Sequence, residues 1–280
     1  MKYYISYIIG FSFPFVVILI FVVYIDLFKV FKFSNYYDQN QIVTLNREMI
    51  TTKTYLNNRV SQQYNSFIFG SSRSQAYKTS EWRKYLKPDS KCFHFDASWE
   101  SVLGIYLKIK FIDKKGDILK NALIIIDEDI LSQTNLKTGH LYIPLPEVSQ
   151  NSIIQFYFTY VQATLNPLFL FSYIYYNLTN EYREWMGMFV TPIKLDKFTG
   201  DIITCDLYYP QDQMIIRDSV GYYEKLKQNG TFNQKKISDK KFNYETIESL
   251  LDSMLFIFEK YNTNYKIVIS PNFDQKKNGF

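Results

Sequence analysis

The chain has 280 residues, of which 47% are hydrophobic and 19% aromatic, and its formal net charge is +5. This composition can fill a substantial core, which excludes a disordered protein, and the length fits one domain or one domain with an anchor. The basic residues are scattered or interleaved with acids, as between Lys235 and Lys241, so no nucleic-acid partner is expected.

The side chains that could bind a metal or react with a substrate are few. Cys92 and Cys205 show neither a CxxC pair nor metal-ligand spacing, and their spacing leaves open whether they form a disulfide. His94 and His140 are the only histidines. We therefore predict no metal site and no cofactor.

The first residues, 3–25, are nearly all apolar or aromatic, and no charge occurs between Lys2 and Asp26. A helix of this length spans a bilayer core at about 1.5 Å per residue. Residues 26–33 lack a small-x-small cleavage pattern, which favours an uncleaved signal anchor over a cleaved signal peptide. We therefore predict a single-pass protein of the cell membrane that contacts the lipid bilayer through residues 3–25.

The orientation of this anchor follows from its flanks and from the long segment behind it. Lys2 lies on one side, and Lys29 and Lys32 lie on the other, so the count of positive charges is nearly balanced. A long domain can be translocated whatever these charges are, and we expect the C-terminal domain to lie outside the cytoplasm. Residues 26–60 are expected to form a helical connector, with a helix from Ile42 to Val60.

Residues 61–280 alternate between strand and helix patterns. Short apolar runs at 66–69, 91–95, 122–126 and 266–269 predict buried strands, and helical patterns occur through Trp82 and Tyr85, at 101–112 and at 247–261. This alternation is typical of an α/β domain with a parallel sheet.

The segment from about 134 to 240 is rich in aromatic residues and turns and is predicted to be an insertion that covers one edge of the sheet. Within it, the apolar stretch Ile153 to Tyr176 predicts an amphipathic helical segment against the domain or the membrane surface. A second membrane span is less favoured, because the stretch contains polar residues and the mean hydropathy of the chain is −0.19.

Small and acidic residues follow each predicted strand. They are Gly70-Ser71-Ser72, Asp96-Ala97-Ser98, Asp127-Glu128-Asp129 and Ser270-Pro271-Asn272. In parallel sheets ligands bind beyond the carboxyl ends of the strands, so these residues are the candidate site. Ser72 could act there as a nucleophile, as an anion ligand or only as a helix cap.

The strand Phe67–Phe69 followed by Gly70-Ser71-Ser72-Arg73-Ser74, behind one N-terminal apolar segment, resembles the membrane-anchored branch of the SGNH (GDSL-like) hydrolase superfamily. Weaker matches occur at 93–98, 122–127 and 267–271. The resemblance covers the sheet-forming parts between about 60 and 274. It implies a flavodoxin-like three-layer αβα sandwich, and esterase or O-acyltransferase activity on cell-envelope polysaccharides.

The resemblance also implies roles for single residues. Ser72 would be the nucleophile. Its own N–H and the turn near Ala97 and Ser98 would supply oxyanion donors. Independently of the resemblance, the N–H groups of the turn formed by Gly70, Ser71 and Ser74, together with Arg73, could hold an anion. Asp127 stands where the family usually has an asparagine donor, and a carboxylate cannot donate unless it is protonated.

The family's last block, Asp-x-x-His, is absent from the sequence. Serine is a poor nucleophile without such a base, so we expect a C-terminally incomplete domain that is inactive or truncated as given. The alternative is a non-catalytic membrane-tethered protein that uses the turn from Gly70 to Ser74 to bind an anion or a glycan. An intracellular anion-binding membrane protein is a weaker third option. The partner would be an envelope polysaccharide or acyl donor, and the sequence does not indicate an oligomeric state.

Overall fold

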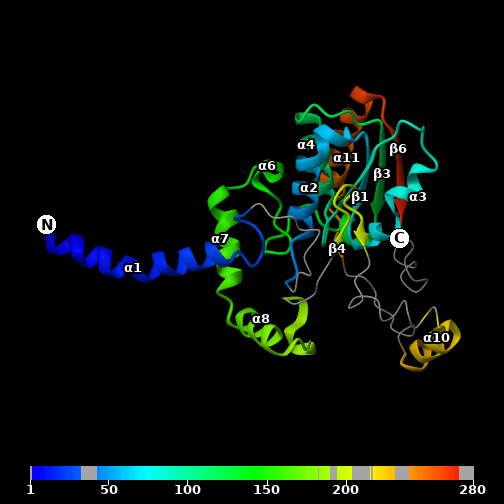
Figure 1. The fold of residues 1–280 in the computed structure, drawn as a ribbon. Coiled ribbons are helices and arrows are strands. Elements are labelled where there is room, and N and C mark those ends of the chain that lie inside the picture. Colours follow the sequence, from blue (N-terminus) through cyan, green and yellow to red (C-terminus); the bar gives the residue numbers. More distant parts are fainter. Residues whose placement is uncertain are drawn as a thin grey trace.

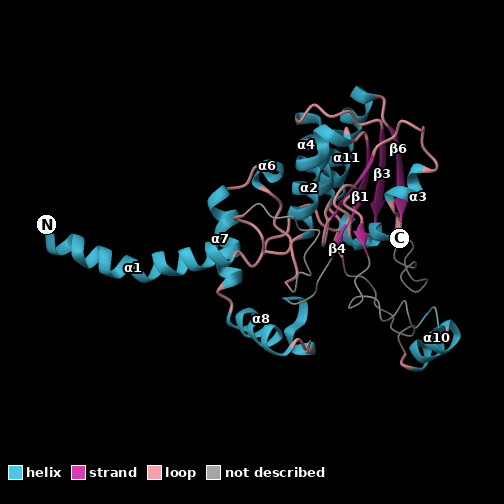
Figure 2. Cartoon of the chain, viewed as in Figure 1, coloured by secondary structure: helices cyan, strands magenta, loops and turns pink. Residues whose placement is uncertain are grey.

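The computed structural model describes residues 2–32, 43–181, 183–189, 194–203, 215, 217–230 and 240–270. At its centre is a four-stranded parallel sheet, shown in magenta in Figure 2. The strands are β1 (Ser66–Gly70), β2 (Cys92–Asp96), β3 (Asn121–Ile126) and β6 (Asn264–Ile269), in the order β2-β1-β3-β6. The predicted α/β class with a parallel sheet is confirmed.

The strand order reverses between β1 and β3, because the chain passes from β1 to β2 on one side and returns to β3 on the other. In such sheets the crevice at this reversal is the usual ligand site. Gly70 is in register with Asp96 of β2, so the turns that follow both strands leave the sheet at the same edge.

Helices cover both faces of the sheet (Figure 1). On one side lie α2 (Arg47–Gln62), α4 (Val102–Lys114) and α11 (Tyr244–Tyr261). The side chains of Phe67 and Phe69 join the main core there, where Tyr55 of α2 packs against Phe67, Phe93 and Phe95. Ile68 points to the opposite face and packs with Trp82 of α3 (Thr79–Arg83). This alternation explains why β1 is apolar and buried along its whole length.

One predicted helix through Trp82 and Tyr85 is replaced by a 3-10 helix, η1 (Ser72–Ala76), and the short α3. Tyr77 and Lys78 have extended backbones. The N–H and hydroxyl of Thr79 donate to the carboxylate of Asp201, at 3.1 and 2.6 Å. These bonds start a new helix at Thr79 in place of the continuation of η1.

The region from 127 to 230 contains short helices and one hairpin. The bounds are α5 (Glu128–Leu131), α6 (Pro146–Ser149), α7 (Ile153–Thr164), α8 (Pro167–Thr179), η2 (Glu184–Phe189), β4 (Lys194–Leu195), β5 (Ile202–Ile203) and α10 (Ser219–Gln228). The helical segment expected over Ile153 to Tyr176 is two helices, because Pro167 cannot continue α7 and Asn166 caps α8. The turn between β4 and β5 covers the free edge of β2, where His94 N donates to Thr199 O at 2.8 Å.

The N-terminal helix α1 (Lys2–Ile25) contains Pro14 and extends away from the rest of the molecule (Figure 1). Phe11, Phe15 and Tyr24 are among its many exposed apolar or aromatic side chains, whereas Val22 is buried. Among the residues that the structure describes, no helix is both long and apolar enough to cross a membrane. The predicted span at 3–25 therefore stays a prediction.

Two other expectations differ from the structure. The expected helix from Ile42 begins only at Arg47, where Asn46 accepts a hydrogen bond from Met49 N at 3.2 Å. The last strand, β6, was expected to be buried, and this is wrong: most of its residues are exposed. It lies at the edge of the sheet and pairs only with β3 in the described part of the chain.

The end of β1 is packed too closely for any side chain at Gly70. A Cβ atom there would lie 2.8 Å from Ser74 Cβ and 3.0 Å from Ile125 O. We predict that Gly70→Ala lowers the free energy of unfolding by roughly 1–3 kcal/mol, because η1 and β3 must both shift. Gly10→Ala is the control, since nothing lies within 4 Å of its added Cβ. Equal stability of the two variants in thermal or denaturant unfolding would show that η1 does not pack against β1.

Candidate functional site

The turn after β1 exposes only one of its serines. Ser71 and Ser74 are 7% and 0% exposed, whereas Ser72 is exposed at the first position of η1. Ser71 precedes the helix and its side chain makes no capping hydrogen bond. Ser72 is therefore the first residue of η1 and not its cap, and it follows β1 at the edge of the sheet where the strand order reverses.

Asp127 holds this turn from the end of β3. Its Oδ2 accepts a hydrogen bond from Ser71 Oγ at 3.1 Å, and Arg73 Nε lies 3.4 Å from the same oxygen. Its Oδ1 accepts from Ile130 N at 2.8 Å and so caps α5. Asp127 is thus an acceptor that positions Ser71 and Arg73, which differs from the donor that the family pattern has at this place.

The turn after β2 is held by Arg47, a residue that the sequence did not single out. Arg47 Nη1 lies 2.8 Å from Asp96 Oδ2, and its Nε donates to Ser98 Oγ at 2.8 Å. The N–H of Ala97, an expected oxyanion donor, instead donates to Gly70 O at 3.3 Å. The predicted residues Ala97 and Ser98 therefore join β2 to β1 and to α2.

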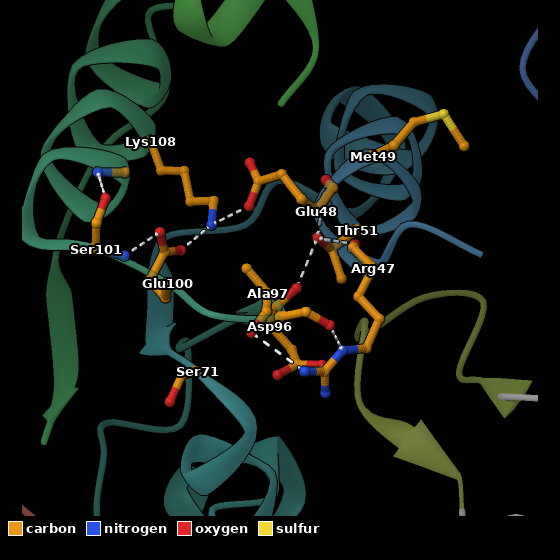
Figure 3. A network of polar contacts seen from close by, with 12 residues as sticks. Arg47, Glu48, Met49, Thr51, Ser71, Asp96, Ala97, Glu100, Ser101 and Lys108 are labelled. Carbon is orange, nitrogen blue, oxygen red and sulfur yellow. Dashed lines mark hydrogen bonds and ion pairs between the residues drawn. The ribbon is translucent and has the colours of Figure 1, made fainter. Parts of the chain in front are cut away.

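A buried ion cluster lies beside this turn. Figure 3 shows Lys108 of α4 between Glu48 of α2 and Glu100, and its Nζ contacts a carboxylate oxygen of each. Lys108 is 0% exposed, and Glu48 and Glu100 are 5% exposed. Glu100 Oε1 also accepts from Ser101 N at 2.9 Å. The cluster joins α2, α4 and the loop that follows β2.

Burial and mutual attraction act in opposite directions in this cluster. Burial raises the pKa of Glu48 to about 7, although the charge of Lys108 opposes this. Burial alone would lower the pKa of Lys108, but the charges of Glu100 and Glu48 outweigh it and raise that pKa. Lys108 is therefore charged at neutral pH, and the carboxyl groups of Glu48 and Glu100 both contact this one buried cation.

The space next to the cluster is too small for a substrate. A cavity of about 20 Å³ is lined by Glu48, Trp99, Glu100 and neighbouring residues, which is room for about one water molecule. Trp99 has a left-handed backbone with φ of 53°, and Lys137 Nζ lies 3.6 Å from the centre of its ring. A bulky residue keeps such a backbone only where its surroundings fix it. We infer that the packing around Trp99 fixes the backbone of this loop.

A serine, a histidine and an aspartate form a hydrogen-bonded chain under the turn. Ser74 Oγ lies 2.8 Å from His94 Nε2, and His94 Nδ1 lies 3.1 Å from Asp201 Oδ1. This is the order of groups in a nucleophile activated by an oriented base. Ser74 and His94 are both 0% exposed, so no acyl substrate reaches the Ser74 hydroxyl.

Asp201 fixes the direction of the hydrogen bonds in this chain. Burial would raise its pKa, but hydrogen bonds from His94 and Thr79 outweigh burial and lower that pKa. An ionised carboxylate only accepts, so His94 donates from Nδ1 and its Nε2 faces Ser74. The Ser74 hydroxyl also lies 2.7 Å from Ser71 O. His94 and Asp201 therefore hold the inner side of the serine turn.

The second histidine lies elsewhere. His140 packs against Phe28 with a distance of 4.9 Å between ring centres, and burial lowers its pKa to about 4. In the described part of the chain, neither histidine contacts Ser72. Cys92 is buried with a free thiol, and Cys205 lies outside the described residues.

Sequence reasoning missed Arg47, Glu48, Lys108 and Asp201. For Lys108 a signal was present, because it lies on the apolar face of α4 with Ile105, Ile109 and Ile112. A lysine on the core-facing side of a helix is buried only when an opposite charge pairs with it. The position of Lys108 therefore indicated a buried carboxylate partner. For Asp201 no local signal exists, since its partners lie more than a hundred residues away in the sequence.

Comparisons of the chain with protein-family models, with curated proteins and with solved structures find no match. The resemblance to the SGNH hydrolases therefore stays a prediction. The function has to be inferred from the geometry of the site.

The Asp201 carboxylate is expected to stabilise the fold above acidic pH. Because its pKa is lowered from 3.8 in the folded state, its stabilisation is present above that value and is lost as the pH falls below it. Asp201→Asn should lower the free energy of unfolding by roughly 1–3 kcal/mol at pH 7, with a smaller difference at pH 3. Denaturant unfolding at both pH values measures this. The exposed Asp252→Asn is the control, and an equal loss at both pH values would contradict an ionised Asp201 carboxylate that accepts from His94 and Thr79.

Removal of the buried Lys108 cation should lower the free energy of unfolding far more than removal of an exposed lysine. Lys108→Met leaves two buried carboxylates without a cation, and we predict a loss of roughly 3–5 kcal/mol in the free energy of unfolding. Adding Glu48→Gln should restore more of it at pH 8 than at pH 6, because loss of Lys108 raises the pKa of Glu48 above about 7 and the carboxyl group is then already protonated at the lower pH. Lys120→Met is the matched control, since the Lys120–Asp89 pair is exposed, and its effect should be small. A Lys108→Met protein as stable as this control would mean that the cluster is not buried in solution.

Proposed function

We propose that the chain has the scaffold of an SGNH-type esterase or O-acyltransferase, with Ser72 as the acyl-accepting hydroxyl. One observation carries the proposal. Ser72 is exposed at the reversal point between β1 and β3, while the serines on both sides of it are buried and hydrogen-bonded. A serine at the carboxyl edge of a parallel sheet is where such folds present a nucleophile.

The strand order supports the same proposal. The order β2-β1-β3-β6, with helices on both faces, agrees with the first four strands of a flavodoxin-like αβα sandwich. Fold alone does not define activity, so the weight rests on the exposed serine. The substrate would be an acyl ester of a cell-envelope polysaccharide, as the sequence resemblance implies.

In ester chemistry, Ser72 Oγ would attack the acyl carbonyl and form a new ester, while the bond between the acyl carbon and the sugar oxygen breaks. A base would carry the serine proton to the released sugar hydroxyl. His94 is hydrogen-bonded to Ser74 and Asp201, and His140 packs against Phe28. Neither is placed to take the proton from Ser72 within the described residues. We therefore expect slow acylation of Ser72 and little turnover by the chain as given.

Because His94 and His140 contact other residues and not Ser72, a second candidate is a non-catalytic binding protein. Arg73 is next to Ser72, and its side chain is 36% exposed. It could contact a carboxylate or phosphate group of a glycan while Ser72 donates a hydrogen bond. In this candidate the serine turn binds the ligand without forming a covalent bond.

In both candidates we propose that α1 tethers the domain to a lipid bilayer, with the domain outside the cytoplasm. Support comes from the uncharged sequence between Lys2 and Asp26 and from the exposed apolar side chains along α1. In water such a surface is unfavourable by about 25 cal/mol per Å² of apolar area. Lipid would remove that cost.

A fluorophosphonate probe tests the role of Ser72 directly, because it reacts with a nucleophilic serine as an ester does. We expect labelling of the full chain to map to Ser72 by mass spectrometry and to be abolished in Ser72→Ala. Ser80→Ala, which removes another exposed serine, should be labelled like the unchanged chain. Labelling at the buried Ser74 would contradict the proposed nucleophile.

Absence of labelling would contradict acyl chemistry and favour the binding protein. Calorimetry with an acidic oligosaccharide, and separately with inorganic phosphate, then tests that candidate. Loss of one charged hydrogen bond in Arg73→Gln should weaken binding about tenfold or more. Equal affinity of Arg73→Gln and the unchanged chain would contradict the binding role of this turn.

A further inference from the structure

Helices α7 and α8 form an uncharged surface at the point where α1 joins the domain. No Asp, Glu, Lys or Arg occurs between Glu147 and Glu181. Because neither α7 nor α8 contains a charged residue, the outer faces of both helices are uncharged. Surface helices of a domain in water normally carry charges on that face.

These outer faces are apolar. On α7, Phe156 and Tyr160 point into the core, whereas Ile153, Ile154 and Phe158 are 62%, 81% and 57% exposed. On α8, Phe169 and Ser172 are buried. Its exposed side includes Leu168 (49%), Phe171 (60%), Ile174 (54%) and Leu178 (80%). Both helices thus have one side in the protein and a second apolar side that the described residues leave exposed.

The two helices are fixed to the base of α1 by stacked rings. Phe28, just after α1, stacks on Phe169 of α8 with 4.9 Å between the ring centres, and its ring centre lies 5.8 Å from that of Tyr160 in α7. Phe31 stacks on Tyr157 of α7 with 5.3 Å between the ring centres. Figure 1 shows α7 beside the carboxyl end of α1. These rings therefore hold α7 and α8 next to the carboxyl end of α1.

We propose that α7 and α8 lie in the interface of a lipid bilayer, with their exposed apolar side chains in the acyl boundary. The exposed apolar side chains, the position beside the end of α1 and the tyrosines along both helices fit this environment, since Tyr and Trp collect at membrane interfaces. Tyr157 and Tyr175 are of this kind, and Trp185 contacts both Phe171 and Tyr175. The proposal extends the proposed tether, but different residues carry it.

This surface gives the domain a second contact with the bilayer. A single helix leaves a domain free to rotate about its tether, whereas two further helices at the interface restrict its orientation. The membrane would then limit which side of the domain meets a polysaccharide.

Depth measurements at single sites test the proposal in the full chain. In a Cys205→Ala background, which retains the buried Cys92, we would place an environment-sensitive fluorophore at Ile154→Cys or Leu178→Cys. Val60→Cys and Tyr85→Cys are matched controls, because these positions are 77% and 86% exposed on other parts of the domain. The protein is reconstituted in vesicles of phosphatidylcholine and phosphatidylglycerol. Some of these lipids carry a spin label on the acyl chain, which quenches a fluorophore that enters the bilayer.

We expect a blue shift and several-fold stronger quenching at positions 154 and 178 than at positions 60 and 85. Equal, weak quenching at all four positions would overturn the proposal. A blue shift at 154 and 178 without lipid quenching, increasing with the protein-to-lipid ratio, would also overturn it and indicate a second copy as the partner.

A label at Phe15→Cys separates this proposal from the tether. Quenching at position 15 alone would retain α1 as the anchor and refute the role of α7 and α8. Quenching at 154 and 178 alone would support the interface contact and refute the tether.

Discussion

Lys108 is fully buried, and its ammonium group contacts Glu48 from α2 and Glu100 from the loop after β2. A charge in the core is tolerated only when partners surround it, so the three segments must come together for any of them to be stable. Arg47, the neighbour of Glu48, then reaches Asp96 and Ser98. The first turn of α2 thus fixes the edge of the sheet where the candidate site lies.

From that fixed edge, the serine turn is held on two sides. Asp127 accepts from Ser71 on one side, and His94 pairs with Ser74 on the other. Close packing at Gly70 brings η1 directly against β1 and β3. Ser72 is exposed because the residues on both sides of it are held, and such preorganisation is what a binding or acyl-accepting hydroxyl needs.

Sequence patterns located the sheet because its strands are short apolar runs that end in turn residues, as at Phe67–Gly70 and Ala122–Asp127. The same patterns could place Ser72 at the sheet edge. They could not show that Ala97 N–H is bonded to Gly70 O, or that Arg47, in an expected connector, belongs to the domain. They also could not pair His94 with Asp201, since that contact depends on how the insertion returns to β2.

The hairpin turn that brings Asp201 to His94 also accepts a hydrogen bond from the outer backbone of β2. Exposed sheet edges invite pairing with strands of other molecules, and natural proteins often cover them. At β2 this cover is a turn that also carries the partly buried Asp201. On the opposite edge, β6 exposes Tyr265, Ile267 and Ile269 and pairs only with β3 among the described strands. The outer edge of β2 is therefore covered at His94, and among the described strands β6 presents the edge that could pair with a strand of another molecule.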